Sequence, residues 1–261
     1  DLLAQAADLP LADYLRGTAG KRQIAVNAAL GALLQANEYA ILRACTEGFP
    51  VLKLKVGMAP VADEIARLRQ IAARLPAGHL LRLDANGAWC ESDAERFLAA
   101  CNGLPIEMVE EPLANPLADP RFDVLRRLQA NCRFALALDE SLAGGNPQAI
   151  IAASPVRRLI LKPPRSGGLL PALALARQAA SAGMHCVVTS SVDSACGVLA
   201  AAHLAAALDN DLAHGLATSS WLAADTGTPA PIASGRLTLP GQAGLGFTPT
   251  PGLAFSAEAF R

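Results

Sequence analysis

Five apolar, strand-like runs in the middle of the chain each end on a charged residue. In chain order they are VLKLK ending at Lys55, LLRLD at Asp84, IEMVE at Glu110, FALALD at Asp139 and RLILK at Lys162. The charged ends recur at intervals of roughly 25 residues, the length of one strand, one helix and two short loops. This period predicts repeated βα units whose charged ends meet at one edge of a parallel sheet.

Eight candidate strands with near-constant spacing can be marked along the chain. They cover residues 23–29, 50–56, 79–84, 106–110, 134–139, 157–162, 185–190 and 212–217. Most are continuous apolar runs without polar alternation. This is typical of parallel strands that are covered by helices on one face and by a barrel core on the other.

Segments with helical periodicity lie between these strands. We expect helices over residues 61–75, 93–101, 119–130, 147–153, 170–182 and 195–208. Ser92 and Glu95 fit a capping box that opens the second of them. Alternating strands and helices form either a closed barrel or a doubly wound open sheet. The charged ends favour the barrel, because an open sheet gathers its site at one switch point whereas a barrel brings many strand ends to one mouth.

Composition limits the remaining possibilities. A length of 261 residues suits a single α/β barrel domain. The net charge of −1 gives no electrostatic reason to expect nucleic acid or an anionic membrane as a partner. No apolar run reaches the roughly 20 residues of a membrane span, and no signal peptide is evident, so we expect a cytoplasmic location. The six cysteines form no CxxC pair, and we expect buried free thiols.

The three acidic ends could form a metal site. Asp84, Glu110 and Asp139 fall on adjacent predicted strands, about 5 Å apart, so their carboxylates would repel one another without a cation. An all-oxygen ligand set suits Mg²⁺ or Mn²⁺ better than Zn²⁺. The alternative is three separate helix caps or rim salt bridges.

The lysines could supply a base. Lys53 and Lys55 are two residues apart and therefore face the same side of a strand, with Lys55 nearer the rim. Lys162 would lie across the mouth from Lys55. Two ammonium groups near a divalent cation favour each other's neutral form, which makes a lysine base accessible near neutral pH. The alternative is a set of lysine stems that merely pair with the acids.

In this order and spacing, LKLKVG, RLDANGAW, VEEPL, LALDES and LILKP resemble the enolase superfamily, and specifically its muconate-lactonising branch, over about residues 23–222. RLDANGAW, EEPL, DES and TSSVDSACG are most similar to the members that form 2-succinylbenzoate for menaquinone biosynthesis. The resemblance implies a TIM-like (β/α)7β barrel whose N-terminal α+β cap domain is largely missing here. Residues 1–22 would then be a remnant linker or cap segment, and residues 223–261 a segment returning toward the cap.

The resemblance also implies roles for the charged ends. Asp84, Glu110 and Asp139 would bind Mg²⁺, with Mn²⁺ a possible substitute. Lys55 would remove an α-proton and then help hydroxide leave, and Lys162 would stabilise the enediolate as a cation. The implied reaction is that of a hydro-lyase on a small carboxylate, the dehydration of 2-succinyl-6-hydroxy-2,4-cyclohexadiene-1-carboxylate to 2-succinylbenzoate.

Other side chains near the strand ends are weaker candidates for substrate contacts. They are Lys53, Arg82, Asn86, Gly167, Ser190 and Ser191. An ordinary salt bridge explains Arg82 and Asn86 equally well, and a turn explains the serines and Gly167.

Three other functional interpretations stay open. A racemase or epimerase would use both lysines as opposed bases, and a Schiff-base aldolase would use Lys162 as its nucleophile. A truncated, catalytically silent barrel is the third. Because cap loops close over the mouth in the superfamily, we expect the chain to bind Mg²⁺ but to have weak or no synthase activity alone. The sequence does not indicate an oligomeric state.

Overall fold

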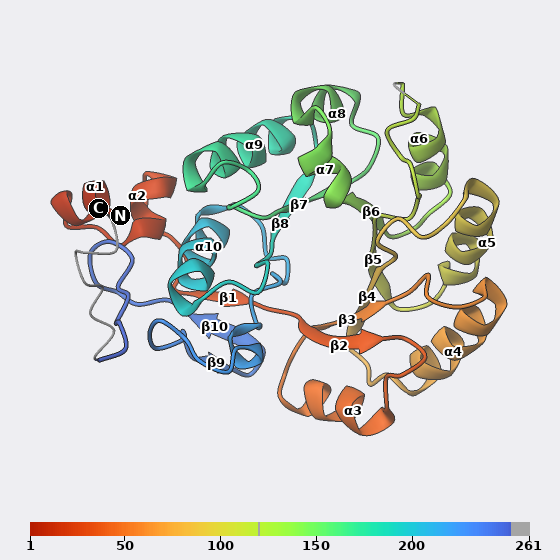
Figure 1. Cartoon of the computed structure of the whole chain (residues 1–261), viewed down its shortest axis with the longest axis horizontal. Coiled ribbons are helices and arrows are strands. Elements are labelled where there is room, and N and C mark those ends of the chain that lie inside the picture. The colour runs from red at the N-terminus through yellow and green to blue at the C-terminus, as the bar shows by residue number, and fades with distance from the viewer. Residues whose placement is uncertain (120, 252–261) are drawn as a thin grey trace, which may run out of the picture.

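The computed structural model describes residues 1–119 and 121–251 (Figure 1). The helices are α1 Leu2–Ala6, α2 Leu11–Arg16, α3 Glu38–Thr46, α4 Val61–Arg74, α5 Glu91–Cys101, α6 Asp123–Ala130, α7 Glu140–Gly144, α8 Pro147–Ala153, α9 Leu169–Ser181, α10 Ala195–Ala207 and the 3₁₀ turn η1 Ser219–Trp221. The strands are β1 Gln23–Ala25, β2 Ala28–Ala32, β3 Val51–Lys55, β4 Leu80–Asp84, β5 Ile106–Glu110, β6 Ala135–Leu138, β7 Arg158–Leu161, β8 His185–Val188, β9 Ile232–Ala233 and β10 Arg236–Thr238.

Strands β2 to β8 form a seven-stranded parallel sheet in chain order, and Figure 1 shows helices α3, α4, α5, α6, α8 and α9 arranged outside it. The segment around His214 closes the sheet into a barrel. His214 bridges to Val26, just before β2, and Gly215 bridges to Thr189, just after β8, both in parallel. The predicted (β/α)7β barrel is therefore confirmed, with its eighth strand reduced to these two bridges.

The strand predicted over residues 23–29 is divided in the structure. β1 leaves the barrel and pairs antiparallel with β10, which in turn pairs with β9. The barrel strand begins only at Ala28. Because the partner of β1 lies more than two hundred residues away, no local pattern marks the division. The other six predicted strands of the parallel sheet match the structure to within two residues at each end.

Two helix starts were predicted wrongly. The helix expected from Asp119 begins at Asp123, because the Asp119 carboxylate accepts a hydrogen bond from Arg121 N at 3.0 Å and Phe122 adopts a left-handed conformation with φ 58°. The Ser92–Glu95 capping box is absent from α5, which starts earlier and has no side-chain cap. Helices α3 and α7 were not predicted.

The two ends of the described chain pack together on α10. Leu11 N donates to Gly244 O at 2.8 Å, and the buried His203 of α10 ties both segments to the barrel. Its Nδ1 accepts from Ala12 N at 3.1 Å, so its Nε2 carries the proton that faces Leu245 O at 3.0 Å. Residues 252–261, which belong to the predicted returning segment, lie outside the described residues. Within the described ranges, no second domain of the α+β kind is present.

Within these same ranges no helix is long and apolar enough to cross a membrane. The cysteines are all free, and three of them, Cys101, Cys132 and Cys186, are buried as expected. Burial raises the pKa of the Cys186 thiol to about 12. Cys90 is exposed, so the expectation of buried thiols is wrong there, because this residue lies in a surface loop at the start of α5.

Candidate active site

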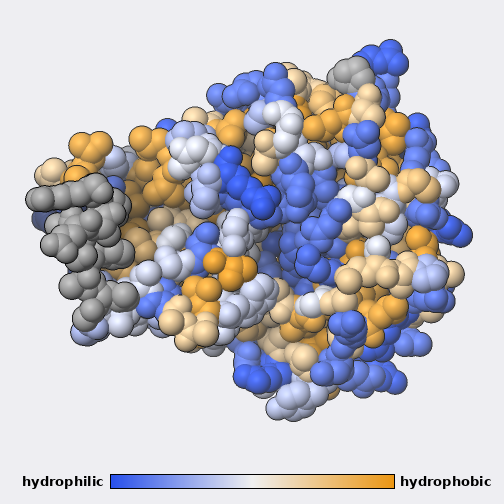
Figure 2. Space-filling view, viewed as in Figure 1, coloured by the Kyte–Doolittle hydropathy of each residue, from blue (hydrophilic) through white to orange (hydrophobic). Residues whose placement is uncertain are grey.

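The carboxyl ends of the barrel strands surround a cavity of about 330 Å³. Figure 2 shows hydrophilic residues gathered around the hollow at the centre of the barrel. The lining includes these candidates from the sequence: Lys53, Lys55, Asp84, Asn86, Asp139, Lys162, Ser190 and Ser191. It also includes residues that sequence reasoning missed: Asn27, Glu140, Arg165, Thr189, Thr218 and Trp221.

Strand register brings the charged ends together. Lys55 is paired with Asp84 across β3 and β4, and Asp84 with Glu110 across β4 and β5. Glu110 is in turn paired with Ala137, and Asp139 follows two residues later, directly after the end of β6. The three carboxylates therefore lie at the carboxyl ends of three adjacent strands, and each residue is at least 95% buried.

Two lysines neutralise these acids. Lys53 Nζ lies 3.0 Å from Asp84 Oδ2 and also forms an ion pair with Glu110. Lys162 Nζ forms an ion pair with Asp139. Burial alone would lower the pKa of Lys53, but the charges of Glu110 and Asp84 outweigh burial, so the pKa is raised and this side chain is held as an ammonium. Burial raises the pKa of Asp139, while the neighbouring Lys162 opposes this effect.

The acids have the donor chemistry of a hard-cation site. Glu110 Oε1 is buried and has no hydrogen-bond partner among the described residues, and the Nε atom of Arg82 lies 4.0 Å away, too far for a hydrogen bond. A hard cation could supply the missing close contact to this oxygen. In the structure, however, the three carboxylate groups do not point toward a common centre. Across residues 1–119 and 121–251, no three acidic, histidine or cysteine side chains are close enough together to hold a metal ion. Instead Asp84 and Asp139 point at lysine ammonium groups.

Lys55 has a different partner from the other two lysines. Its exposed ammonium donates to the amide oxygen of Asn86 at 2.9 Å. Asn86 is held in a left-handed conformation with φ 45°, where its backbone N donates to Asp84 Oδ1 at 3.1 Å and its amide nitrogen donates to Glu140 Oε1 at 3.2 Å. Asn86 thus fixes a neutral acceptor beside the lysine at the rim.

Arg82 lies inside the barrel and not at its rim. It is completely buried, and its guanidinium donates to Glu107 Oε2 at 2.9 Å, to Asn27 Oδ1 at 3.1 Å and to Ala213 O at 2.8 Å. These contacts agree with the alternative that Arg82 forms an ordinary salt bridge and does not contact the substrate. Burial raises the pKa of Glu107, but the charges of Arg82 and Arg158 prevail, and the net pKa is lowered.

The remaining candidates differ in position. Ser190 Oγ shares a 2.6 Å hydrogen bond with Thr218 Oγ1 at the cavity wall, and Ser191 N donates to Asp193 Oδ2 at 3.1 Å. Gly167 lies outside the cavity lining in a turn after β7, with φ +83°. This left-handed conformation suits glycine and agrees with the simple turn.

Glu111 has a supporting role beside the acids that sequence reasoning did not assign. Its buried carboxylate accepts from the backbone N of Asp139 at 2.7 Å and from the Ser141 hydroxyl. It therefore fixes the backbone from which the Asp139 carboxylate projects. The two consecutive acids of VEEPL were the available signal, since one of them faces the barrel and the other must find partners elsewhere.

The fold and the mouth define an α/β barrel with a charged site at the carboxyl ends of its strands. A family model described as "Enolase C-terminal domain-like" matches residues 36–253. The chain belongs to this family, within the enolase superfamily.

Similar proteins in this superfamily are enzymes with several activities. L-Ala-D/L-Glu epimerase of Bacillus subtilis (strain 168) is 30% identical over 77% of this chain and 55% of that protein. Chloromuconate cycloisomerase of Pseudomonas putida is 29% identical over 94% of this chain and 66% of that enzyme, and o-succinylbenzoate synthase of Thermobifida fusca (strain YX) is 33% identical over 63% and 50%. The chain thus spans less than two thirds of the length of each.

A solved structure extends the likeness to three dimensions. The substrate-liganded complex of the L-Ala-D/L-Glu epimerase from Bacillus subtilis superposes with a TM-score of 0.83 at 26% identity, covering 94% of this chain and 68% of that one. The comparisons establish the superfamily and its barrel, and they include several different reactions.

Proposed function

We propose that this barrel removes a proton next to a substrate carboxylate, and that its reaction is the dehydration of 2-succinyl-6-hydroxy-2,4-cyclohexadiene-1-carboxylate to 2-succinylbenzoate. The chain would then act as an o-succinylbenzoate synthase. The observation that carries this proposal is the unequal pairing of the two lysines. Lys162 is paired with the carboxylate of Asp139, whereas Lys55 faces the neutral amide of Asn86.

Unequal pairing favours a reaction with one base. Lys162 lies against the carboxylate of Asp139, so its ammonium group is positioned as a fixed cation at the site. Lys55 lies at the rim against a neutral amide, where it is positioned to take a proton from a substrate in the cavity. Epimerisation needs a base on each side of the substrate carbon, whereas elimination needs one base and a group that stabilises the developing charge.

Each step can be assigned to a residue of this chain. Lys55 Nζ takes the α-proton, and the electron pair of the broken C–H bond moves into the carboxylate to give an enediolate. The Lys162 ammonium stabilises that negative charge. The electron pair then returns to expel hydroxide, which takes the proton from Lys55 and leaves as water. Loss of water makes the ring aromatic, which drives the reaction forward.

Asp84, Glu110 and Asp139 would hold Mg²⁺, which supplies positive charge for the carboxylate of the enediolate. Lys53 keeps two of these acids neutralised and in place. Ser190 and Ser191 present hydroxyl groups at the opposite wall, where they can receive a second carboxylate of the substrate.

Epimerisation is the second candidate, and the comparisons support it. The epimerase of Bacillus subtilis matches 77% of the chain, against 63% for the synthase of Thermobifida fusca. In that reaction both lysines would exchange protons with the substrate, which deuterium exchange can detect.

The dehydration is tested by ultraviolet detection of 2-succinylbenzoate, with the purified chain in excess over substrate so that slow turnover is visible. We expect Mg²⁺-dependent product, and a rate roughly 100- to 10,000-fold lower for Lys55→Ala, the usual contribution of a general base. Lys21→Ala is the matched control, because Lys21 pairs with the exposed Asp211 away from the cavity. Product formation without Mg²⁺, or at the parent rate in Lys55→Ala, would refute the proposal.

A further inference from the structure

A buried acid of α4 is bound to the loop that follows Lys55. The carboxylate of Glu64 accepts two backbone hydrogen bonds, from Gly57 N at 2.8 Å and from Met58 N at 3.0 Å. Glu64 is only 1% exposed, so both bonds are shielded from water. Gly57 and Met58 are two and three residues after Lys55, and Glu64 therefore holds the backbone where β3 leaves the sheet.

The two bonds fix the loop in position and in direction. The two oxygens of one carboxylate bind two consecutive amides, so the peptide between them can neither shift nor rotate without losing a bond. Hydrogen bonds to an ionised acceptor are also stronger than bonds to a neutral one. Burying the charge of Glu64 is costly, and the two amides and the positive end of α4 compensate this cost.

Gly57 places this loop directly against the loop that follows β4. Gly57 has φ +80°, and a Cβ atom there would lie 2.3 Å from Ala88 Cβ and 3.3 Å from Ala85 O. A residue with a side chain could not approach so closely. Ala85 and Ala88 flank Asn86 in the sequence, so the backbone held by Glu64 packs on the loop that carries Asn86.

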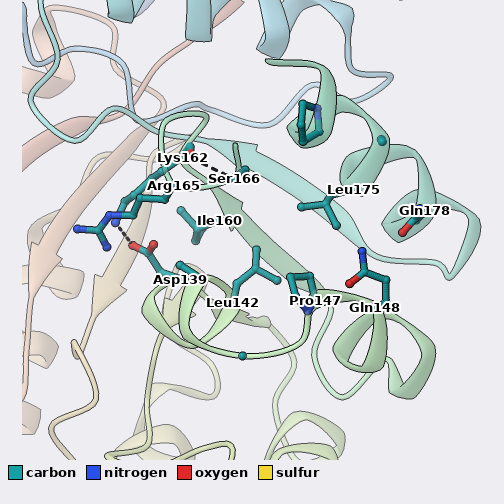
Figure 3. Close-up of a pocket in the computed structure, with 14 residues that line it drawn as sticks. Asp139, Leu142, Pro147, Gln148, Ile160, Lys162, Arg165, Ser166, Leu175 and Gln178 are labelled. Carbon is teal, nitrogen blue, oxygen red and sulfur yellow. Dashed lines mark hydrogen bonds and ion pairs between the residues drawn. The ribbon is translucent and has the colours of Figure 1, made fainter. Parts of the chain in front are cut away.

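The position of Lys55 depends on this backbone more than that of the lysine across the mouth. Figure 3 shows Lys162 facing the carboxylate of Asp139, with which it forms an ion pair. Lys55 is exposed, and its ammonium donates to the neutral amide of Asn86 at 2.9 Å. Because a lysine stem is flexible, this contact persists only if the loops after β3 and β4 keep their separation.

We propose that Glu64 is a positioning residue for Lys55. By holding the two amides after β3, it keeps Lys55 Nζ beside Asn86 and within reach of a substrate in the mouth. The catalytic consequence rests on the proposed function, in which Lys55 is the base. A base that is misplaced by about 1 Å can cost roughly 100-fold in rate, so loss of Glu64 should slow proton removal without weakening substrate binding.

Single-turnover kinetics with the proposed substrate, Mg²⁺ and an excess of the purified chain test this consequence. In Glu64→Ala we expect the rate constant at saturating chain concentration to fall about 10- to 100-fold. The half-saturating concentration should change by less than about 2-fold. Glu64→Gln, which keeps one oxygen acceptor and is the milder change if Glu64→Ala does not fold, should lose less. A parental rate constant in both variants, or a change in half-saturating concentration alone, would overturn the inference.

Gln129 offers a matched control at the other end of the barrel. Its buried side chain also accepts two backbone hydrogen bonds, from Leu136 N at 2.8 Å and from Arg157 N at 3.0 Å. These amides lie near the starts of β6 and β7, away from the mouth. Gln129→Ala should destabilise the fold but leave the single-turnover rate constant unchanged. Equal losses of rate in Gln129→Ala and Glu64→Ala would indicate a general structural effect and overturn the inference.

Two further measurements need no turnover. Amide hydrogen exchange followed by NMR should be faster at Gly57 and Met58 in Glu64→Ala, because both amides lose their acceptor. Acetylation of Lys55, measured by mass spectrometry relative to Lys21, should also be faster, because the amine is no longer held against Asn86. Asn86→Ala sets the rate expected for a released Lys55. Acetylation at the parental rate in Glu64→Ala would overturn the inference.

The results separate the two proposals. If neither the parent chain nor any variant forms 2-succinylbenzoate, the dehydration is refuted, and faster acetylation of Lys55 in Glu64→Ala would still support the positioning role. If the parent chain forms the product and Glu64→Ala matches it in rate constant and in acetylation, the role of Glu64 alone is refuted.

Discussion

Lys53 Nζ lies 3.0 Å from Asp84 Oδ2, and the same ammonium pairs with the fully buried Glu110. A lysine thus stands between two of the three acids that we propose as metal ligands. The side chain of Lys53 is 20% exposed, so most of this pairing takes place out of water. The ammonium group compensates the charges of two neighbouring carboxylates in the barrel interior.

Lys53→Met should therefore destabilise the metal-free chain. Removing one partner of a buried ion pair costs about 3 kcal/mol, because the remaining charge is left uncompensated. Urea unfolding should show this loss, and added Mg²⁺ should restore part of it by binding the freed carboxylates.

Lys21→Met gives the comparison for Lys53→Met, since exposed ion pairs contribute about 0–1 kcal/mol. Equal stability of Lys53→Met and Lys21→Met, or no recovery with Mg²⁺, would contradict the role of Lys53.

Arg82 should matter for stability and not for substrate affinity. Its guanidinium is fully buried and satisfies Glu107, Asn27 and a backbone carbonyl at once. Arg82→Met should lower the free energy of unfolding by about 3–5 kcal/mol. Arg96→Met, which removes an exposed pair with Asp93, should change it by less than about 1 kcal/mol. A variant of Arg82 with parental stability but weakened substrate binding would instead favour a direct contact with the substrate.

The buried histidines should make the fold sensitive to acid. Burial lowers the pKa of His214 to about 3, below the value of about 6.5 in an unfolded chain. Its Nδ1 accepts from Val188 N at 3.1 Å and cannot also carry a proton. Burial also lowers the pKa of His203. The unfolded state therefore binds more protons below pH 6.5, and stability falls as the pH falls from about 6.5 toward 3.

Urea unfolding measured between pH 7.5 and 4.5 checks this dependence. Each buried histidine contributes a slope of up to about 1.4 kcal/mol per pH unit. His214→Gln should remove one such contribution, because glutamine can accept the same backbone hydrogen bond without titrating. His185→Gln changes an exposed histidine and should leave the slope intact. If the free energy of unfolding of His214→Gln depended on pH as steeply as that of the parent chain, His214 would not be the source of the acid sensitivity.

Local sequence patterns were sufficient for the barrel and for the order of its charged ends. Continuous apolar strands ending in a charge give the register that places Asp84 beside Glu110. The pairing of charges was not predictable, because it depends on side-chain reach across strands. Lys53, two residues below the rim, reaches the acids, whereas Lys55 turns to Asn86.

Long-range contacts explain the other differences. Arg82 lies two residues before Asp84, so strand alternation places both side chains on the same face. Its partners Asn27 and Ala213 come from both ends of the barrel, and no local sequence pattern reveals them. The division of the first strand depends likewise on the distant β10.

The most direct test of the account uses N-acetylalanine, a chiral probe carboxylate suited to the alternative racemase reaction. The exchange of its α-hydrogen in D₂O with Mg²⁺ is followed by proton NMR on the separate L and D forms. If Lys55 is the single base and Lys162 is a fixed cation, the α-hydrogen should exchange in one enantiomer only, without interconversion of the two forms. This exchange should be lost in Lys55→Ala. Exchange in both enantiomers with interconversion would contradict the assignment of Lys162 as a cation and would establish two-base epimerisation.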